Sequence, residues 1–208
     1  LLPVHSPSSN EVNIIIEISE GEIADVGMIR IHGNFLTKEK VIRRHVGLQP
    51  GRRYDAVELE LSKTRIKQTQ LFNDVKITPQ QEDEDHPEQR DVLIEVQEKN
   101  TGSFNFGVGF GSDSGVLGQI SLVQNNFDIA DVPETFGELF RGRAFRGAGQ
   151  QFQMNFQPGD EIFAYDISLT EPRIFETDFS LSGSGGYLRR VYRDYIESRL
   201  SASTALSR

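Results

Sequence analysis

Cysteine is absent from the 208 residues, which excludes disulfide bonds and thiolate chemistry. There is also no run of 18 or more apolar residues, so a membrane-spanning helix is excluded. Membrane β-strands are not excluded, because their apolar and polar residues alternate and their average hydropathy resembles that of a soluble protein. The mean hydropathy of −0.42 is therefore compatible with a soluble protein and with a barrel.

Positive charge is scarce as well, since the net charge is −9 and the isoelectric point is about 5.0. Nucleic-acid-binding proteins normally carry a basic face, so no nucleic-acid partner is expected. The first residues lack the basic start and apolar core of a signal peptide, so the signal of an exported protein would lie upstream of this sequence. No enzyme, cofactor or metal site is predicted, because no metal-ligand spacing joins the four histidines His5, His32, His45 and His86.

The composition changes near Asn100. Before this residue charged side chains are dense, and the patterns between residues 26 and 98 predict a strand, two helices and two strands. This order favours an α+β module with a three-stranded sheet covered on one face by two helices. The strands are expected at 28–32, 75–78 and 91–97, and the helices at 38–46 and 56–70.

The start of each helix has a recognisable signal. Thr37 is the expected N-cap of the first helix, whose inner side carries Val41 and Ile42. Asp55 and Glu58 have the spacing of a capping box for the second helix. The β-rich run 12–19 has no place in this module, so we interpret it as the last strand of a preceding copy.

After Asn100 apolar and polar residues alternate in successive runs separated by turn residues. Two further runs, 116–124 and 196–206, bring the expected number of strands to six. The apolar positions of the first four runs are Phe104, Phe106, Val108 and Phe110; Phe152, Met154 and Phe156; Phe163, Tyr165, Ile167 and Leu169; and Phe179 and Leu181. Residues 112–115 and 158–160 have the composition of tight hairpin turns.

A membrane barrel and a soluble β-sandwich both give such alternation. The polar positions here carry Gln, Asn, Ser and Gly with few charges, as a barrel lumen does, and the apolar positions are rich in Phe. This difference favours antiparallel transmembrane β-barrel strands. Because the smallest typical barrel has about eight strands, the sequence is expected to hold an incomplete barrel.

Four short segments, 29–34, 37–44, 51–55 and 71–75, together resemble a POTRA domain. The run 96–110 resembles the junction between the last POTRA domain and the first barrel strand of BamA-type outer-membrane assembly factors. The resemblance divides the chain into the end of a preceding POTRA repeat (1–25), a POTRA domain (26–99) and N-terminal barrel strands (100–208). Residues 125–149 are too long for a simple turn and are interpreted as an inserted segment.

The resemblance implies a non-enzymatic protein of the outer membrane, with its POTRA part in the periplasm. Its implied function is to fold and insert β-barrel proteins. Its implied partners are unfolded outer-membrane protein clients, outer-membrane lipid and accessory assembly-complex subunits. Two alternatives remain, a related two-partner-type secretion transporter and a soluble β-rich binding protein.

Three candidate sites follow from this interpretation. Client strands are expected to pair with the first barrel strand, at Ser103, Phe104, Asn105, Phe106, Gly107, Val108, Gly109 and Phe110. Its glycines, Gly102, Gly107, Gly109 and Gly111, either weaken strand pairing or only relieve crowding inside the barrel. The second candidate is a POTRA edge strand at Val75, Lys76, Ile77 and Thr78, which could equally be an ordinary edge without a client. The third is a membrane-surface helix with Phe136, Leu139, Phe140, Arg141 and Arg143, or else a longer turn with a helical tip.

Overall fold

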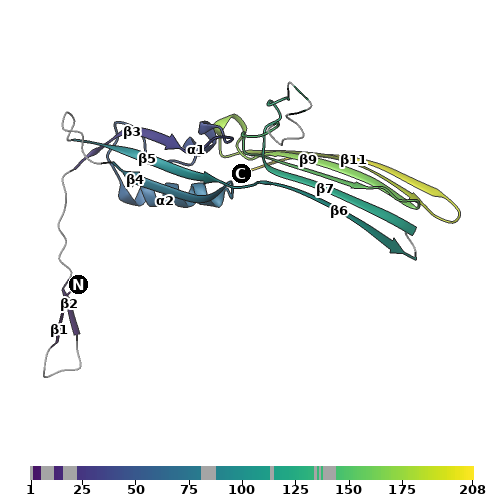
Figure 1. Ribbon diagram of the computed structural model, residues 1–208, viewed down its shortest axis with the longest axis horizontal. Coiled ribbons are helices and arrows are strands. Elements are labelled where there is room, and N and C mark those ends of the chain that lie inside the picture. The colour runs from purple at the N-terminus through teal and green to yellow at the C-terminus, as the bar shows by residue number, and fades with distance from the viewer. Residues whose placement is uncertain are drawn as a thin grey trace.

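The computed structural model describes residues 2–5, 12–15, 23–80, 88–112, 115–133, 135, 137 and 144–208, with only the backbone described in the first two ranges. An α+β module and a long curved sheet lie end to end (Figure 1). Among the described residues, no helix is long and apolar enough to cross a membrane.

The α+β module has the predicted element order. Its elements are β3 (Asp25–His32), α1 (Glu39–Arg43), α2 (Ala56–Gln68), β4 (Phe72–Pro79) and β5 (Gln89–Glu98). The strand order is β3-β5-β4, in which β5 runs parallel to β3 and antiparallel to β4. The second strand of the module in the sequence, β4, therefore lies at an edge of its sheet, as expected.

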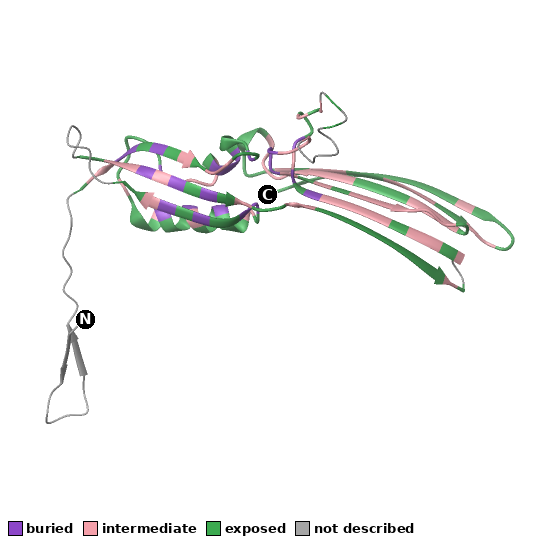
Figure 2. Ribbon diagram, in the orientation of Figure 1, coloured by how far each residue is buried: buried purple, intermediate pink, exposed green. Residues whose placement is uncertain are grey.

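One hydrophobic core holds this module together. Alternate residues of β5, namely Val92, Ile94 and Val96, are buried, as the two-residue period of a strand requires. They pack in the same cluster as buried side chains of both helices and of β3 and β4, including Val26, Val41, Ile42, Leu59, Ile66, Val75 and Ile77. Figure 2 shows that the buried positions concentrate in the module.

The helix starts agree with the sequence only in part. Asp55 caps α2, because its side chain accepts hydrogen bonds from the backbone N–H groups of Val57 and Glu58. A helix does form where the first one was predicted, with Val41 and Ile42 buried, but it covers only Glu39–Arg43. The prediction of Thr37 as its N-cap is wrong, because the N-cap residue is Lys38, without a side-chain cap. Thr37 is 2% exposed and contacts a distant segment instead.

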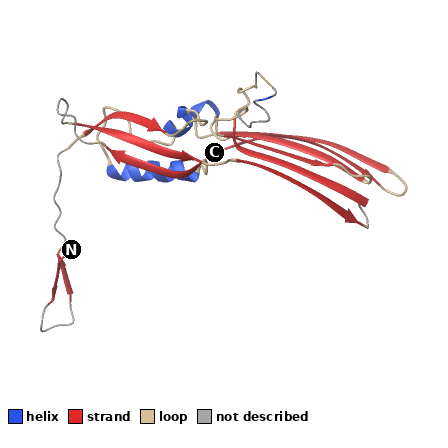
Figure 3. Ribbon diagram, viewed as in Figure 1, coloured by secondary structure: helices blue, strands red, loops and turns tan. Residues whose placement is uncertain are grey.

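The curved sheet has six antiparallel strands in sequence order (Figure 3). They are β6 (Gly102–Gly111), β7 (Gly115–Phe127), β8 (Gln150–Gln157), β9 (Ile162–Glu171), β10 (Ser180–Val191) and β11 (Ile196–Ser207). A short 3-10 helix, η1 (Ile174–Glu176), lies between β9 and β10. The first and last strands each have one hydrogen-bonded neighbour, so the described sheet is not closed.

The pairing register gives this sheet two chemically different faces, because directly opposite residues lie on the same face. One row is apolar in all six strands: Phe106, Ile120, Phe156, Tyr165, Tyr187 and Leu200. The next row, on the other face, is mostly small and polar: Asn105, Ser121, Asn155, Asp166, Gly186 and Ser201. These faces are called the aromatic face and the polar face below.

The aromatic face has no second sheet packed on it among the described residues (Figure 1). Phe104, Phe106 and Phe110 are 63%, 80% and 82% exposed. A β-sandwich would bury such side chains between two layers. The described sheet is thus a single wall, as in a barrel, and not half of a sandwich.

Candidate functional site

The first candidate site is the open edge of β6. This strand pairs only with β7 in the described sheet, through the register Gly102↔Gln124 to Gly111↔Gly115. An edge strand leaves alternate backbone N–H and C=O groups without a partner, and another strand can add there. The residues predicted for client pairing, 103–110, all lie within β6.

The glycines of β6 differ in their surroundings. A methyl group at Gly102 would come within 2.4 Å of Gln124 Oε1, whereas at Gly107 or Gly109 it would meet no described atom within 4 Å. Crowding among the described residues therefore accounts for Gly102 and not for the other two. Because Gly107 and Gly109 have no side chains to pack against a neighbouring strand, strand pairing at this part of the edge is weak.

The other two candidate sites lie elsewhere. Val75–Thr78 belong to β4, whose free edge faces away from β5, and Lys76 forms an exposed ion pair with Glu95 at 3.8 Å. The predicted membrane-surface residues Phe136, Leu139, Phe140, Arg141 and Arg143 lie outside the described residues. Among the described residues, no group of acidic or histidine side chains could hold a metal ion.

Sequence patterns did not predict a polar junction between the module and the sheet. The amide of Asn126, at the end of β7, donates to Thr37 Oγ1 at 2.8 Å and accepts from the Gly149 N–H at 3.0 Å, and both bonds are buried. The Lys38 N–H donates to the Gly147 carbonyl at 2.9 Å. The loop before α1 is thereby joined to both ends of the β7–β8 connection.

Two further contacts fix this loop. The Glu98 carboxylate accepts from the backbone N–H groups of Phe35, Leu36 and Thr37 at 3.2, 3.0 and 2.6 Å. The Lys38 ammonium forms an ion pair with Asp128, whose side chain is 2% exposed. Loss of this ion pair is costly, because Asp128 without its cation would be a buried unpaired charge.

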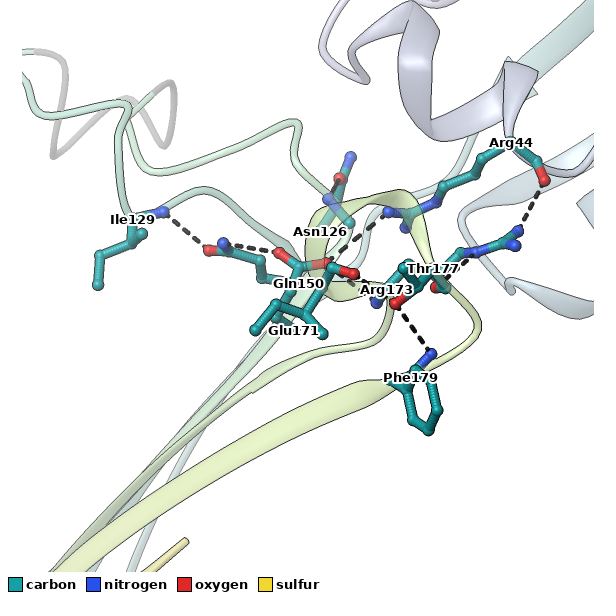
Figure 4. A network of polar contacts seen from close by, with 10 residues as sticks. Arg44, Asn126, Ile129, Gln150, Glu171, Arg173, Thr177 and Phe179 are labelled. Carbon is teal, nitrogen blue, oxygen red and sulfur yellow. Dashed lines mark hydrogen bonds and ion pairs between the residues drawn. The ribbon is translucent and has the colours of Figure 1, made fainter. Parts of the chain in front are cut away.

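A second set of contacts joins the end of α1 to the turn between β9 and β10 (Figure 4). The Arg173 guanidinium donates to the Arg44 carbonyl at 2.7 Å and to the Thr177 carbonyl at 3.3 Å, and pairs with Asp178. The Glu171 carboxylate accepts from Gln150 Nε2 at 3.0 Å and from the Arg173 N–H at 3.2 Å. The module therefore contacts the end of β7, the β7–β8 connection and the β9–β10 turn through polar groups.

Comparisons with known proteins agree with this architecture. Residues 24–99 match the POTRA family, described as a surface antigen variable number repeat. Outer membrane protein assembly factor BamA of Buchnera aphidicola is 29% identical over 170 residues, or 82% of this chain and 24% of the relative. BamA of Neorickettsia risticii is 27% identical over 194 residues, or 91% of this chain and 23% of the relative.

A solved structure covers both parts together. BamA from Haemophilus ducreyi lacking POTRA domains 1–3 superposes on 99% of this chain and 36% of its own, with a TM-score of 0.73 and 25% identity. The chain therefore consists of a POTRA-like α+β module followed by six antiparallel strands that match part of the BamA barrel. CdiB from Acinetobacter baumannii shares the fold, with a TM-score of 0.52 and 16% identity over 88% of this chain and 33% of its own.

The chain spans about a quarter of the length of the curated relatives named here. The POTRA match from residue 24 to 99 covers the module and ends just before β6. The junction described above therefore joins the POTRA domain to the barrel strands, and Thr37 and Asn126 stand on opposite sides of it.

We expect the Thr37–Asn126 contact to stabilise the junction between the POTRA-like module and the six-stranded sheet. Asn126→Ala removes the donor to Thr37 and the acceptor for the Gly149 N–H, and should lower the unfolding free energy by about 1–3 kcal/mol. Thr37→Val should be non-additive with it in a double-mutant cycle. Chemical denaturation measures the cycle, and Asn155→Ala, on the polar face of the sheet, should show no coupling to Thr37→Val.

His45 gives the junction a pH dependence. Burial and then the nearby guanidinium groups of Arg44, Arg173 and Arg65 lower the pKa of His45 from 6.5 to about 4. Between these values the unfolded chain binds the proton more readily than the folded chain, so stability falls as the pH drops from about 6.5 to about 4. Amide hydrogen exchange of α1 should accelerate over this range in the intact protein, and His45→Gln should flatten the change.

The exposed His32 on β3 offers the matched control for this titration. His32→Gln should leave the acceleration of α1 exchange intact. An unchanged pH profile in the His45→Gln protein would contradict the assignment of the effect to this imidazole.

Proposed function

We propose that this chain forms part of a protein that folds β-barrel proteins and inserts them into the outer membrane, with its POTRA domain in the periplasm. The observation that carries the proposal is the position of β6, which follows the POTRA domain directly and, within the described sheet, pairs with β7 alone. The named BamA relatives are outer membrane protein assembly factors, and their similarity supports the same role here.

The proposed mechanism needs no catalytic group. An unfolded client strand adds to the free edge of β6, where main-chain hydrogen bonds provide the affinity. In lipid the gain is large, since each unsatisfied backbone group there costs several kcal/mol. Gly107 and Gly109 weaken the pairing between β6 and any strand at this edge, so that a client strand can displace that strand.

The two-faced sheet fits the outer membrane as its surroundings. The aromatic face, which includes Phe106, Phe156 and Tyr165, would contact lipid. The polar face, which includes Asn105, Asn155 and Asp166, would line a water-filled lumen, where Asn155 Nδ2 donates to Asp166 at 2.8 Å. A sheet with one surface in lipid and the other in water needs no second sheet packed against it.

The remaining sites are assigned subordinate roles. We infer that the free edge of β4, at Val75–Thr78, offers a second strand-pairing surface to clients or accessory subunits in the periplasm. We also infer that residues 136–143, within the inserted segment, lie on the inner surface of the outer membrane. The contacts would be made by Phe136, Leu139, Phe140 and the two arginines Arg141 and Arg143. Normal client insertion after deletion of residues 130–143 would remove that role.

The N-terminal residues are assigned to a preceding POTRA repeat. The backbones of β1 (Leu2–His5) and β2 (Val12–Ile15) pair as an antiparallel hairpin. The last two strands of the described POTRA domain, β4 and β5, form the same kind of hairpin. Residues 1–25 are therefore proposed as the end of one repeat, 26–99 as the next, and 100–208 as barrel strands with the insertion at 125–149.

Cross-linking tests the proposed function. The chain contains no cysteine, so single cysteines can be placed in β6 of the full-length protein, at Ser103 and Asn105. A client barrel protein with a cysteine in its last strand should form disulfides with these positions during insertion. Ser168, in the interior strand β9, is the control and should not react. Equal reaction at Ser168, or none in β6, would overturn strand addition at this edge.

A related secretion transporter is the second candidate function, because the sequence resemblance leaves it open. The number of POTRA domains in the complete protein separates the two. Several upstream copies support barrel assembly, and a total of two supports secretion.

A further inference from the structure

A small cavity lies between α1 of the POTRA domain and the β9–β10 turn. Its volume is about 260 Å³, and its lining includes Lys40, Arg44, Glu171, Arg173, Phe175 and Glu176. Three side chains of this set are cationic and two are anionic. The cavity therefore combines an excess of positive charge with one aromatic wall.

Arg44 is the most unusual group in this cavity. Its side chain is 9% exposed, yet its Nε is buried without a hydrogen-bond partner among the described residues. Its closest carboxylate is that of Glu171, with 3.8 Å between Nη1 and Oε1, which is too long for a hydrogen bond. A guanidinium taken out of water normally has its donors satisfied. The terminal Nη groups, which approach Glu171 only to 3.8 Å, are therefore the donors with capacity for an anion in the cavity.

The other charged groups do not use that capacity. Glu171 already accepts from Gln150 Nε2 and from the Arg173 N–H. The Arg173 guanidinium donates to the carbonyls of Arg44 and Thr177 and to Asp178, so its charge faces the cavity while its donors are occupied. Lys40 is exposed and has no ion pair with any part of the chain that the structure describes. Arg44 and Lys40 are thus the two available cationic donors.

The register of the sheet places the cavity at a definite depth. Glu171 is paired with Leu181, and Leu181 is paired with Leu206, so these three residues form one row. Two residues earlier along β9, Leu169 is paired with Phe152 in another row. These residues share the aromatic face, so the Glu171 row lies about 7 Å beyond the Phe152–Leu169 row toward the POTRA domain. If the aromatic face contacts lipid, this is the level at which hydrocarbon gives way to headgroups.

The electrostatic field around α1 agrees with an anion site. Burial and then the positive charges of Arg44, Arg173 and Arg65 hold the pKa of the neighbouring His45 at about 4. The imidazole is therefore neutral at physiological pH and adds no positive charge that would need its own counter-ion. A phosphate entering the cavity would meet Arg44 and Lys40 as donors and Phe175 as an apolar wall.

We propose that this cavity binds the phosphate of a phospholipid headgroup from the periplasmic leaflet, through Arg44 and Lys40. The bound lipid would join the POTRA domain and the barrel strands, because Arg44 belongs to α1 and Glu171, Arg173 and Phe175 belong to β9 and its following turn. The anion site itself stands on the cavity and on Arg44. The lipid as its source rests on the proposed outer-membrane placement.

Native mass spectrometry of the full-length protein in detergent tests the site. The probe is dioctanoyl phosphatidylglycerol, with dioctanoylglycerol as the ligand that lacks a phosphate and inorganic phosphate as the competitor. Lys40→Gln should weaken binding of the phospholipid about tenfold, since it removes one charge-assisted hydrogen bond from an exposed side chain. Arg44→Gln should weaken it at least as much, and Lys63→Gln on α2 should leave it unchanged.

Each outcome assigns the site or removes it. Saturable binding of the phospholipid that both variants weaken supports the lipid site. Binding of inorganic phosphate with the same dependence on both variants supports the anion site with free phosphate as its source. Equal affinity of wild type, Lys40→Gln and Lys63→Gln would overturn the proposal, and Lys40→Gln keeps this test open even if Arg44→Gln disturbs the junction. A failure of client cross-linking at β6 would leave these titrations unaffected.

Discussion

Proline at an outward-facing position of β6 is expected to reduce client insertion about tenfold or more while the barrel still folds. Consecutive residues of an edge strand point their N–H groups in opposite directions, one toward β7 and the next toward the open edge. Proline lacks this donor, so its effect depends on which edge it faces. Lost main-chain bonds are costly in lipid, which is the reason for the large effect.

Asn105 and Phe106 form a suitable pair for this experiment, since they are adjacent in β6 and paired with Ser121 and Ile120. One of Asn105→Pro and Phe106→Pro should destabilise the barrel, and the other should leave heat-modifiable folding intact and lose insertion of a model client into liposomes. Asn105→Ala and Phe106→Ala control for the lost side chains. If both proline variants fold and insert clients normally, the open edge of β6 has no role.

Gly147→Ala should separate the POTRA domain from the β7–β8 connection. The φ angle of Gly147 is +115°, which a residue with a Cβ rarely adopts, and an added Cβ would lie 2.3 Å from the Leu36 carbonyl oxygen. Backbone strain alone is worth about 1–3 kcal/mol, and the clash adds to it. We expect a loss of about 3 kcal/mol or more in junction stability.

The measurement is amide hydrogen exchange at Lys38, whose N–H group donates across the junction to the Gly147 carbonyl, and at Gly149, whose N–H group donates to Asn126 beside it. Exchange at both should accelerate in the Gly147→Ala protein. Gly183→Ala is the matched control, because a methyl group there would meet no described atom within 4 Å. Unchanged exchange in Gly147→Ala would show that this close approach does not hold the junction.

The sequence predicted the elements whose signals are local. The alternation of Phe104, Phe106, Val108 and Phe110 identified β6, and the Asp55 cap placed the start of α2 correctly. The faces of the sheet followed from the same alternation, because antiparallel pairing keeps opposite residues on one face.

The junction could not be predicted, because its partners lie far apart in the chain. Thr37 is a residue type that is favoured at N-caps, but its hydroxyl group accepts a hydrogen bond from Asn126, 89 residues later. Arg173 reaches Arg44 across 129 residues. The sequence held one local signal, the glycines Gly147 and Gly149 before β8, and both have positive φ in the structure. Their spacing does not reveal which backbone segment lies close to them.

The aromatic face of the sheet is expected to contact lipid, and the polar face is expected to contact water. The direct measurement uses single cysteines at consecutive positions of the interior strand β9, Tyr165, Asp166 and Ile167, each carrying an environment-sensitive fluorophore in the full-length protein reconstituted in vesicles. Lipid-borne nitroxide should quench the label at Tyr165 and Ile167, and an aqueous quencher should reach it at Asp166. Strong quenching by lipid at all three positions, or at none of them, would contradict the account.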